Sequence, residues 1–296
     1  MTRDRILVVG AGSDLGQALL GELGPDSAIA VTSIESMPLP DFNHLRLGPG
    51  DAVPAETLAR CAAVINAAGH AAGDDLAPRS ATIDLSLTIA PAAKKAGVPR
   101  MVHVSSFSVV GTAAYIDGTT EERPINAYGR SEAKAEHLFM GMSSESFSVE
   151  CIRLPFLFAA SKPGLLSPLL SLAKRFRHLP IPAGGPVRRS MITYADAAHQ
   201  LVVASGLGSS GISFVADPQP FDYLLLKTVL AEEVGVKIRL FPVPQIVVAG
   251  TDRLFPALGR RLFRSSLLDP RTNRAGDRPL GLEAELRKLV RSTYGF

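Results

Sequence analysis

The sequence predicts an α/β protein built on a doubly wound parallel sheet. Short apolar runs rich in branched residues alternate with stretches whose apolar residues recur at helical spacing. This alternation is typical of strands joined by helical crossovers, which place the strands parallel in one sheet. The first apolar run also leads straight into a glycine-rich turn, as the first strand of such a sheet often does.

The first segment of the chain predicts a strand, a turn and a helix in succession. Residues 6–9 are apolar and branched, and the turn that follows contains Gly10, Gly12 and Gly16. Gly10 suits a tight turn, Gly12 a close approach of the backbone to a ligand, and Gly16 close packing of the helix on the strand. A helix N-terminus suits a diphosphate through its N–H groups and dipole, although a structural glycine-rich turn has the same pattern. The candidate cofactor-binding residues of this turn are Gly10, Gly12, Ser13, Asp14, Leu15 and Gly16.

The alternation continues to Pro155 and becomes less regular beyond it, which predicts a smaller mixed C-terminal region. The predicted strands cover 28–31, 45–47, 63–69, 101–111, 149–155 and 211–216, with an extended segment at 179–182. The predicted helices cover 55–62, 83–96, 127–142, 165–176 and 223–234, and the segment 191–196 leads into a helix that ends at residue 205.

Two strand ends carry further candidate cofactor-binding residues. Thr32 and Ser33 follow the second strand, where a nicotinamide-binding fold often has an acid for the ribose hydroxyls or an arginine for an extra phosphate. Neither is in place, so the choice between NAD and NADP stays open. Ala67, Ala68 and Gly69 end the strand that begins at residue 63. Their small side chains keep a crevice open for a ligand, and a tight turn of small residues is the structural alternative.

The composition indicates an ordinary globular protein. The 296 residues are 46% hydrophobic and 20% charged with a net charge of +3, and no basic stripe with interleaved aromatics argues for nucleic acid as a partner. Cys61 and Cys151 are too few for a disulfide framework, and no Cys/His cluster has metal-ligand spacing, so we expect no metal. No apolar run reaches the about 18 residues of a membrane span, and residues 1–5 lead directly into a strand. We therefore expect a cytoplasmic protein that binds neither membranes nor nucleic acid.

The order of the motifs resembles that of the extended short-chain dehydrogenases/reductases, the NAD-dependent epimerase/dehydratase family that acts on nucleotide sugars. The motifs are the glycine turn, Val-Ile-Asn-Ala-Ala at 64–68, Val-Ser-Ser-x-x-Val-Val-Gly at 104–111, Tyr-Gly-Arg-Ser at 128–131, Arg-Leu-Pro at 153–155 and Tyr-Ala-Asp at 194–196. The segments 179–182 and 188–190 are similar to the substrate loop of bacterial nucleotide-sugar 4-epimerases and 4-ketoreductases. The resemblance implies a Rossmann-like domain over 1–155 that binds NAD or NADP. It also implies a mostly substrate-binding region over 156–296, of which 190–216 returns to the main sheet.

The resemblance further implies roles for single residues. Tyr128 matches the tyrosine that exchanges a hydroxyl proton during hydride transfer at a sugar carbon, and Ser106 matches the hydroxyl that assists it. Ser105 and Ser108 are the alternatives to Ser106. Arg189 is the candidate for the diphosphate of the substrate, because its planar fork suits bidentate phosphate recognition, and a surface arginine in a loop is the alternative reading. The candidate substrate-binding residues are Ser106, Tyr128 and Arg189, and Pro155 joins the candidate cofactor contacts.

The sequence departs from the family pattern in three places, of which one follows the third strand, where Gly48-Pro49-Gly50-Asp51 stands in place of an acidic residue that commonly contacts the adenine. Four residues after Tyr128 the family has a lysine, whose ammonium favours the phenolate, and Glu132 stands there in this chain. Lys134 and Arg130 lie on other faces of the predicted helix and do not replace that lysine. Ser13 occupies the position of the middle glycine of the turn.

Two functions are consistent with these observations. The first is an NAD(P)-dependent oxidoreductase or epimerase acting on a nucleotide sugar, with Tyr128 as acid/base, Ser106 assisting and Glu132 at the third catalytic position. The second is a regulatory protein of the same fold that holds a dinucleotide or sugar nucleotide without turning it over, which Glu132 and Ser13 favour. The motifs do not separate an epimerase from a ketoreductase. The resemblance also implies a homodimer through helices over 82–96 and 127–142.

Overall fold

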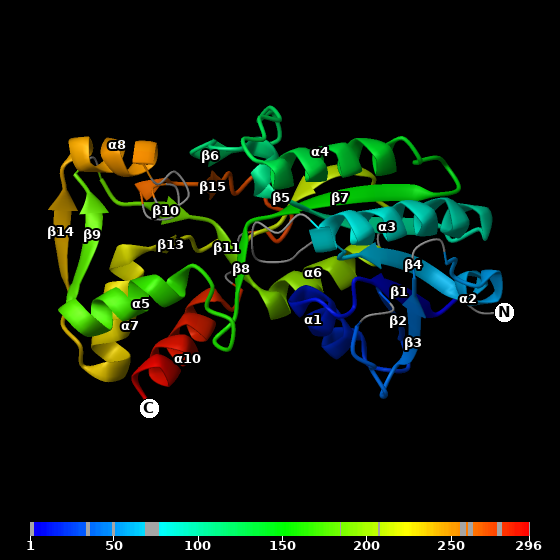
Figure 1. Cartoon of the computed structure of the whole chain (residues 1–296), viewed down its shortest axis with the longest axis horizontal. Coiled ribbons are helices and arrows are strands. Elements are labelled where there is room, and N and C mark those ends of the chain that lie inside the picture. The colour runs from blue at the N-terminus through cyan, green and yellow to red at the C-terminus, as the bar shows by residue number, and fades with distance from the viewer. Residues whose placement is uncertain are drawn as a thin grey trace. The chain divides into compact units, whose positions relative to one another are not determined.

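The computed structural model describes residues 3–33, 36–48, 51–68, 77–183, 185–206, 208–254, 259, 263–276 and 280–295, with the backbone alone for 77–85 and 252. Its central element is a seven-stranded sheet of strand order β12-β7-β5-β4-β1-β2-β3, in which every neighbouring pair is parallel (Figure 1). The strands are β1 (Arg5–Val9), β2 (Ala28–Ser33), β3 (Asn43–Leu47), β4 (Cys61–Asn66), β5 (Arg100–Ser106), β7 (Ser148–Leu154) and β12 (Gly211–Phe214).

The strand order shows how the chain winds. It starts in the middle of the sheet at β1, runs outward through β2 and β3, and then crosses to β4 on the other side of β1. The point between β1 and β4 is therefore the switch point of a doubly wound sheet, where ligands bind in open α/β folds. The predicted α/β, Rossmann-like doubly wound parallel sheet is confirmed, and its glycine turn follows β1 at this switch point.

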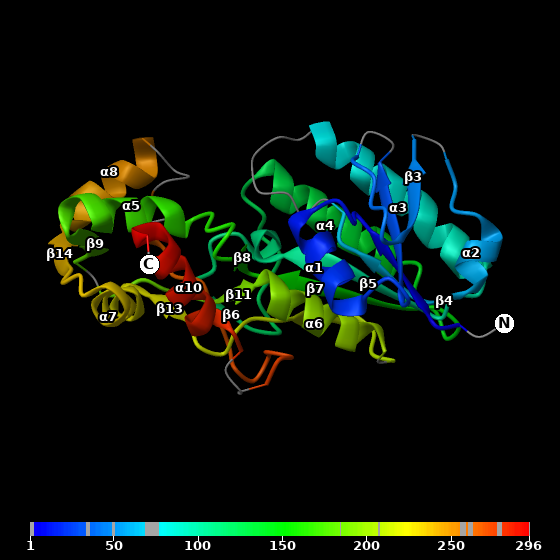
Figure 2. The same cartoon turned by 90° about the horizontal axis from the view of Figure 1, so that it is seen from below.

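Helices cover both faces of the sheet. Figures 1 and 2 show α3 and α4 on one face and α1 and α6 on the other. The helical segments are α1 (Asp14–Leu23), α2 (Ala55–Ala59), α3 (Ala77–Lys95), the 3-10 helix η1 (Phe107–Val110), α4 (Ala127–Met140) and α6 (Tyr194–Ser205).

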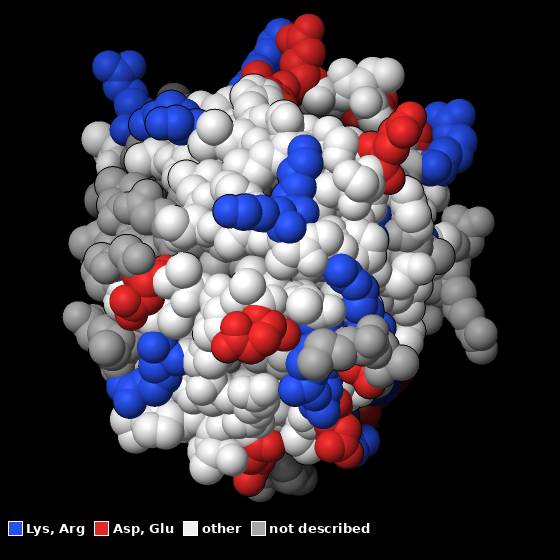
Figure 3. Space-filling view, turned by 90° about the vertical axis from the view of Figure 1, so that its right-hand side faces the viewer, with Lys and Arg blue, Asp and Glu red and all other residues white. Residues whose placement is uncertain are grey.

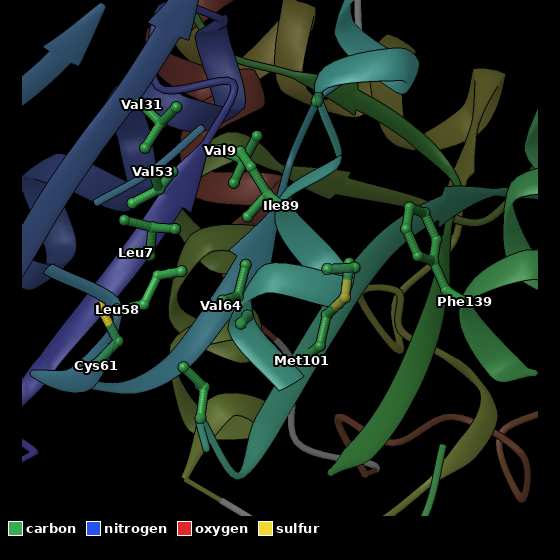
Figure 4. Packing of buried hydrophobic residues seen from close by; sticks show 14 of the residues in the cluster. Leu7, Val9, Val31, Val53, Leu58, Cys61, Val64, Ile89, Met101 and Phe139 are labelled. Carbon is green, nitrogen blue, oxygen red and sulfur yellow. The ribbon is translucent and has the colours of Figure 1, made fainter. Parts of the chain in front are cut away.

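The main hydrophobic cluster lies between the sheet and the α3/α4 layer. Val9, Val64 and Met101 project from β1, β4 and β5, and Ile89 and Phe139 pack on them from α3 and α4 (Figure 4). These side chains are at most 2% exposed. Burying a side chain of this size fully, instead of leaving it exposed to water, stabilises the fold by about 2 kcal/mol. This packing fixes α4 against β5 and β7.

The chain divides into two compact units. The first consists of Met1–Gly111, Glu121–Leu154 and Tyr194–Val215, and the second of Thr112–Thr120, Pro155–Thr193 and Ala216–Phe296. Within the stretch 190–216, α6 and β12 belong to the first unit and β12 joins the large sheet. By contrast, β11 pairs with β8 in a separate two-stranded sheet of the second unit.

The second unit is mixed, because its short strand pairs are both parallel and antiparallel. The pairs β8–β11, β9–β14 and β6–β15 are parallel, whereas β10–β13 is antiparallel. Its strands are β6 (Tyr115–Ile116), β8 (Phe156–Phe158), β9 (His178–Pro182), β10 (Arg188–Arg189), β11 (Met191–Thr193), β13 (Phe221–Asp222), β14 (Arg239–Val243) and β15 (Leu267–Leu268). Its helices are α5 (Leu166–Phe176), α7 (Tyr223–Val234), α8 (Gln245–Leu254) and α10 (Leu282–Tyr294), and α5, α7 and α10 share one apolar cluster.

Two element boundaries differ from the sequence prediction for visible reasons. The strand predicted over 101–111 ends at Ser106, because the Ser106 hydroxyl accepts a hydrogen bond from the Ser108 N–H and starts η1. The helix predicted over 55–62 ends at Ala59, because Cys61 already pairs with β1. The first difference matters for function, since it takes Ser108 off the strand.

The surface of the first unit carries charges of both signs. On the face that Figure 3 shows, lysine and arginine side chains are interspersed with aspartate and glutamate. This pattern is typical of a solvated surface.

Candidate active site

The three glycines of the β1–α1 turn differ in how much space surrounds them. Gly10 has a φ of 81°, and a Cβ there would lie 2.8 Å from the backbone of Ala68. A Cβ on Gly16 would lie 2.2 Å from the carbonyl oxygen of Gly10. Gly12 is unlike both, because its nearest neighbours would be 3.7 Å from a Cβ, among them the methyl of Thr32. The packing therefore requires Gly10 and Gly16, whereas a Cβ at Gly12 would make only ordinary van der Waals contacts, so packing does not require a glycine there.

Ser13 caps the helix that follows the turn. Its hydroxyl accepts a hydrogen bond from the Gly16 N–H at 3.0 Å and donates one to the Gly10 carbonyl at 2.8 Å. A serine in this position stabilises a helix start by about 1 kcal/mol. Leu15 anchors the first helical turn in the core, and Asp14 starts the helix. A helix start presents backbone N–H groups and the positive end of the helix dipole, so the turn fits a diphosphate.

The end of β2 is held by a histidine of β3. The His44 Nδ1 accepts a hydrogen bond from the Leu39 N–H at 3.0 Å, so the ring hydrogen is on Nε2, which lies 2.7 Å from the Thr32 hydroxyl. Thr32 in turn donates to the carbonyl of Ser33 at 3.2 Å. Burial is the main factor that lowers the pKa of His44. Thr32 is thus a buried, fixed hydroxyl, and Ser33 is exposed beside it.

The end of β4 closes over the same turn. The Ala67 N–H donates to the carbonyl of Val9 at 2.9 Å, and the Ala68 N–H donates to the Asn66 side-chain oxygen at 3.2 Å. Both alanines are buried. Gly69, the third residue predicted here, lies outside the described residues.

Tyr128 lies in the first turn of α4, which packs against η1, the segment that follows Ser106. The Asn126 side chain caps α4 by accepting a hydrogen bond from the Gly129 N–H at 2.8 Å. A Cβ on Gly129 would lie 2.3 Å from the Ser108 carbonyl oxygen, so the first turn of α4 is pressed against η1. Tyr128, which is half-buried, therefore lies beside the segment that starts at the buried Ser106.

Ser105 has a different task. Its hydroxyl donates to the Glu136 carboxylate, and both side chains are fully buried. Arg153 donates to the two carboxylate oxygens of Glu136 at 2.9 and 2.7 Å, and to Glu122 at 2.7 Å. Ser105 thus belongs to a network that holds α4 on β5 and β7. Pro155, buried, follows directly on the last residue of β7.

Glu132 is turned into the protein. It lies one helical turn after Tyr128 on the same face of α4, and only 2% of it is exposed. Its Oε2 is 3.9 Å from Nε2 of His103, which is equally buried on β5. Arg130 and Lys134 are exposed, so neither basic side chain takes the place of the family lysine.

His103 and its neighbour Asn66 are the residues of this region that the sequence did not single out. The Asn66 side-chain nitrogen lies 3.0 Å from Nδ1 of His103, and its oxygen accepts from the Ser86 hydroxyl at 2.9 Å. The available signal was a polar pair, Asn66 and His103, inside strands that are otherwise apolar. No spacing rule connects such residues to Glu132, because they lie far from it in the sequence.

Arg189 lies in the second unit, on β10. Its side chain is 8% exposed, and its Nε donates to the carbonyl of Arg264 at 3.0 Å. Burial lowers its pKa, although an arginine remains charged in water near neutrality. Burial raises the pKa of Tyr223 to about 12, with the nearby Arg189 acting in the opposite direction. Arg189 is a buried cation, not a solvated surface arginine.

Two features are absent from the described part of the chain. In the ranges that the structure describes, no three His, Cys, Asp or Glu side chains are grouped so that they could hold a metal ion. None of the described helices is long and apolar enough to cross a membrane.

Residues 4–183 match the family model described as the RmlD substrate binding domain. Because this match spans more than half of the chain, the chain belongs to the RmlD substrate binding domain family. A curated relative from Stigmatella aurantiaca, 4-hydroxy-2-methyl-3-oxo-4-farnesyl-3,4-dihydroquinoline-1-oxide ketoreductase, is 27% identical over 183 residues, which are 59% of this chain and 54% of that protein. The chain thus spans about half the length of the curated relatives that it matches.

Solved structures share the fold over nearly the whole chain. MoeE5 in complex with UDP-glucose and NAD has a TM-score of 0.71 at 19% identity, covering 98% of this chain and 99% of that one. UDP-N-acetylglucosamine 4-epimerase from Methanobrevibacter ruminantium M1, in complex with UDP-N-acetylmuramic acid, has a TM-score of 0.71 at 15% identity, covering 100% and 99%. With the family match, these likenesses confirm the resemblance to the epimerase/dehydratase group.

Proposed function

We propose that the chain is an NAD(P)-dependent oxidoreductase or epimerase that acts on a nucleotide sugar. The observation that carries the proposal is the contact between the first turn of α4 and η1, which brings Tyr128 beside the segment that starts at Ser106. The same unit carries the N-terminus of α1 at the switch point of the sheet. Structural neighbours with this fold were solved with NAD and UDP-glucose or UDP, which supports the class of cofactor and substrate.

The β1–α1 turn would hold the dinucleotide. Gly12, which packing does not require to be a glycine, would let the backbone approach a diphosphate, and the first turn of α1 would donate N–H groups to it. Ser33, which is exposed at the end of β2 beside the buried Thr32, would face the adenosine ribose with its hydroxyl, and Ala67 and Ala68 would leave room beside it. NAD and NADP both remain candidates, because the described end of β2 carries neither the acid nor the arginine that discriminates between them.

The reaction needs one proton moved at a sugar oxygen. The bound nicotinamide supplies the hydride chemistry. Tyr128 would give or take the proton of that oxygen, since its phenol stands at the helix start where it is half-buried. The Ser106 hydroxyl accepts a hydrogen bond from the Ser108 N–H at 3.1 Å, so its own hydrogen is directed to another acceptor, which we propose to be the reacting oxygen.

Arg189 would bind the diphosphate of the nucleotide sugar. A buried guanidinium interacts more strongly with an anion than a solvated one, and its fork binds two phosphate oxygens at once. The exposed neighbour Arg188 offers a matched control. Arg189→Lys should weaken the binding of UDP at least about tenfold in a calorimetric titration, and Arg188→Lys should leave it within about twofold.

A second function is favoured by one observation. Glu132 is buried at the position where the family has its lysine. A carboxylate one helical turn from Tyr128 works against formation of the phenolate, so the chain would bind a dinucleotide or sugar nucleotide without turnover. Glu132→Lys separates the two functions: a gain of turnover in an inactive protein supports lost catalysis, and a loss of turnover in an active one supports the enzyme.

The first experiment is a calorimetric titration of the cofactor-free protein with NAD, NADH, NADP and NADPH. We expect a dissociation constant of about 1–100 μM for one pair, which settles the cofactor. A screen of UDP-, GDP- and dTDP-sugars with that cofactor then tests turnover. No binding of any of the four dinucleotides would refute the oxidoreductase.

A further inference from the structure

A polar pair interrupts the apolar face of the sheet beneath α4. Val9, Asn66, His103 and Cys151 lie side by side in register across β1, β4, β5 and β7. Val9 and Cys151 belong to the main hydrophobic cluster, whereas Asn66 and His103 are polar and at most 2% exposed. Polar side chains buried in this way are stable only when their hydrogen-bonding atoms are used, so the pair has a defined arrangement.

The partners of Asn66 fix the orientation of its amide. Its oxygen accepts from the Ala68 N–H at 3.2 Å and from the Ser86 hydroxyl at 2.9 Å, and both groups approach it as donors. The NH2 group must therefore face Nδ1 of His103, at 3.0 Å. Because NH2 only donates, Nδ1 must accept and cannot carry a hydrogen. The imidazole is thus neutral, with its hydrogen on Nε2.

The Nε2–H of this tautomer faces α4. Glu132 is the group it meets, with Oε2 at 3.9 Å, and the Phe139 ring covers His103 with 4.7 Å between the ring centroids. On β7, Cys151 lies beside His103, and burial raises the pKa of its thiol, which stays neutral. The next acid along α4, Glu136, is paired with Arg153. Within the described surroundings of His103, the acid that its N–H can hold is therefore Glu132.

We propose that Asn66 locks His103 as the neutral Nε2–H tautomer and that this N–H is a positioning donor, which keeps the Glu132 carboxyl on the sheet side of α4. The contact at 3.9 Å is longer than a direct hydrogen bond and acts electrostatically. In its last step the inference rests on the proposed function, since drawing the carboxyl toward the sheet reduces its effect on the phenol of Tyr128. The chain would thus compensate for the missing lysine with a neutral hydrogen-bond donor, His103, instead of a cation.

The tautomer is tested without any turnover. In two-bond 1H–15N spectra of the full-length protein with labelled histidine, we expect His103 to show a bare Nδ1 and a protonated Nε2, unchanged from about pH 5.5 to about pH 8.5. An Nδ1–H tautomer, or an imidazolium at neutral pH, would overturn the inference. His103→Leu identifies the signal, and Asn66→Asp should place a hydrogen on Nδ1 because the carboxylate accepts one. Asn126→Asp, which makes the same change at the α4 cap, should leave His103 as it is. If Asn66→Asp does not fold, the wild-type spectrum decides.

The positioning role is tested in the active enzyme. His103→Leu should lower kcat about tenfold with KM unchanged, and should move the basic limb of the pH profile about one unit upward, because Glu132 is no longer held away from the phenol. Adding Glu132→Gln should restore the profile, a rescue that a merely structural defect would not give. An unchanged profile in His103→Leu, or no rescue, would overturn the role while the proposed function stands. A wild type without turnover would overturn the proposed function and this role together, and the tautomer would still be decided by the spectra.

Discussion

The β1–α1 turn and helix α4 each carry one substitution relative to the family pattern, and the two substituted side chains find their partners in different ways. At the β1–α1 turn, Ser13 replaces a glycine, and its hydroxyl is used at once by Gly10 and Gly16, which are three residues away on either side. At α4, Glu132 replaces a lysine, and the group it meets is His103, on a strand that lies 29 residues earlier. Ser13 thus finds its hydrogen-bonding partners within the same turn, whereas the group nearest the Glu132 carboxylate belongs to another element, β5.

This difference shows which part of the site tolerates change. A helix start offers several backbone donors, so a hydroxyl in place of a glycine finds a use without any other substitution. A buried acid on the side of a helix has no such free backbone donors nearby. It therefore needs a partner side chain from the neighbouring sheet to be stable. We therefore expect substitutions on the α4 side to affect turnover, and substitutions in the turn to affect stability and cofactor binding.

The largest effect is expected at Tyr128. Tyr128→Phe removes the proton donor and should lower kcat at least about 100-fold, because a positioned acid/base contributes that much, with dinucleotide binding unchanged. Ser106→Ala should cost about tenfold to 100-fold, and Ser108→Ala, whose backbone makes the contact with α4, should cost less. Steady-state kinetics with the turned-over sugar nucleotide provide the measurement. If Ser108→Ala costs more than Ser106→Ala, the assisting hydroxyl is misassigned.

Glycine substitutions in the β1–α1 turn test how strongly packing constrains this part of the site. Gly16→Ala places a Cβ 2.2 Å from the Gly10 carbonyl oxygen, which is backbone and cannot move aside, so we expect a loss of about 3 kcal/mol of unfolding free energy. Gly12→Ala meets nothing closer than 3.7 Å, and its stability should stay within about 0.5 kcal/mol of the wild type. Urea denaturation measures both.

The same pair separates packing from ligand binding. Gly12→Ala should weaken the binding of the dinucleotide about tenfold or more although the fold is intact, since its methyl would occupy the space that a diphosphate approaches. Unchanged binding in Gly12→Ala would mean that the open backbone at this position is not where the cofactor lies.

The fold was predictable because its signals are local. The apolar run of β1 and the apolar spacing of α1 lie within twenty residues of each other, and Gly10 and Gly16 mark the turn between them. Helix and strand periods repeat along the first 155 residues, and short crossovers then leave few arrangements of the strands. The end of β5 was misjudged, because a serine cap at Ser106 outweighs the β-branched residues that follow it.

The candidate site was predictable only in part. Motif order placed Ser106, Tyr128 and Glu132 on the right elements, but the burial of Glu132 against His103 depends on the register of two strands and the packing of α4. The same holds for Arg189, whose burial and contact with Arg264 arise from segments far apart in the chain. Pairings of this kind leave no periodic pattern in one sequence.

Smaller effects on stability are expected at Ser13, whose hydroxyl caps α1. Ser13→Ala removes the helix cap and should cost about 1 kcal/mol of unfolding free energy, whereas Ser13→Gly, which restores the family residue, should cost only a few tenths of a kcal/mol. Equal losses in both variants would show that the cap seen in α1 adds nothing. If Ser13→Gly also binds the dinucleotide more tightly, the serine limits cofactor binding at this turn.

The smallest effect is a pH dependence of stability to which His44 contributes. Burial lowers the pKa of His44 below its ordinary value of 6.5, so below that pH the unfolded chain binds a proton that the folded chain resists. Stability from this group is therefore present above about pH 6.5 and is lost as the pH falls through that region. The urea midpoint should decrease between about pH 7 and about pH 5.5, and His44→Gln should make this part of the curve less steep. His137→Gln, an exposed histidine on α4, should leave it as in the wild type because His44 is retained. A curve that stays as steep in His44→Gln as in the wild type would assign the dependence to another group.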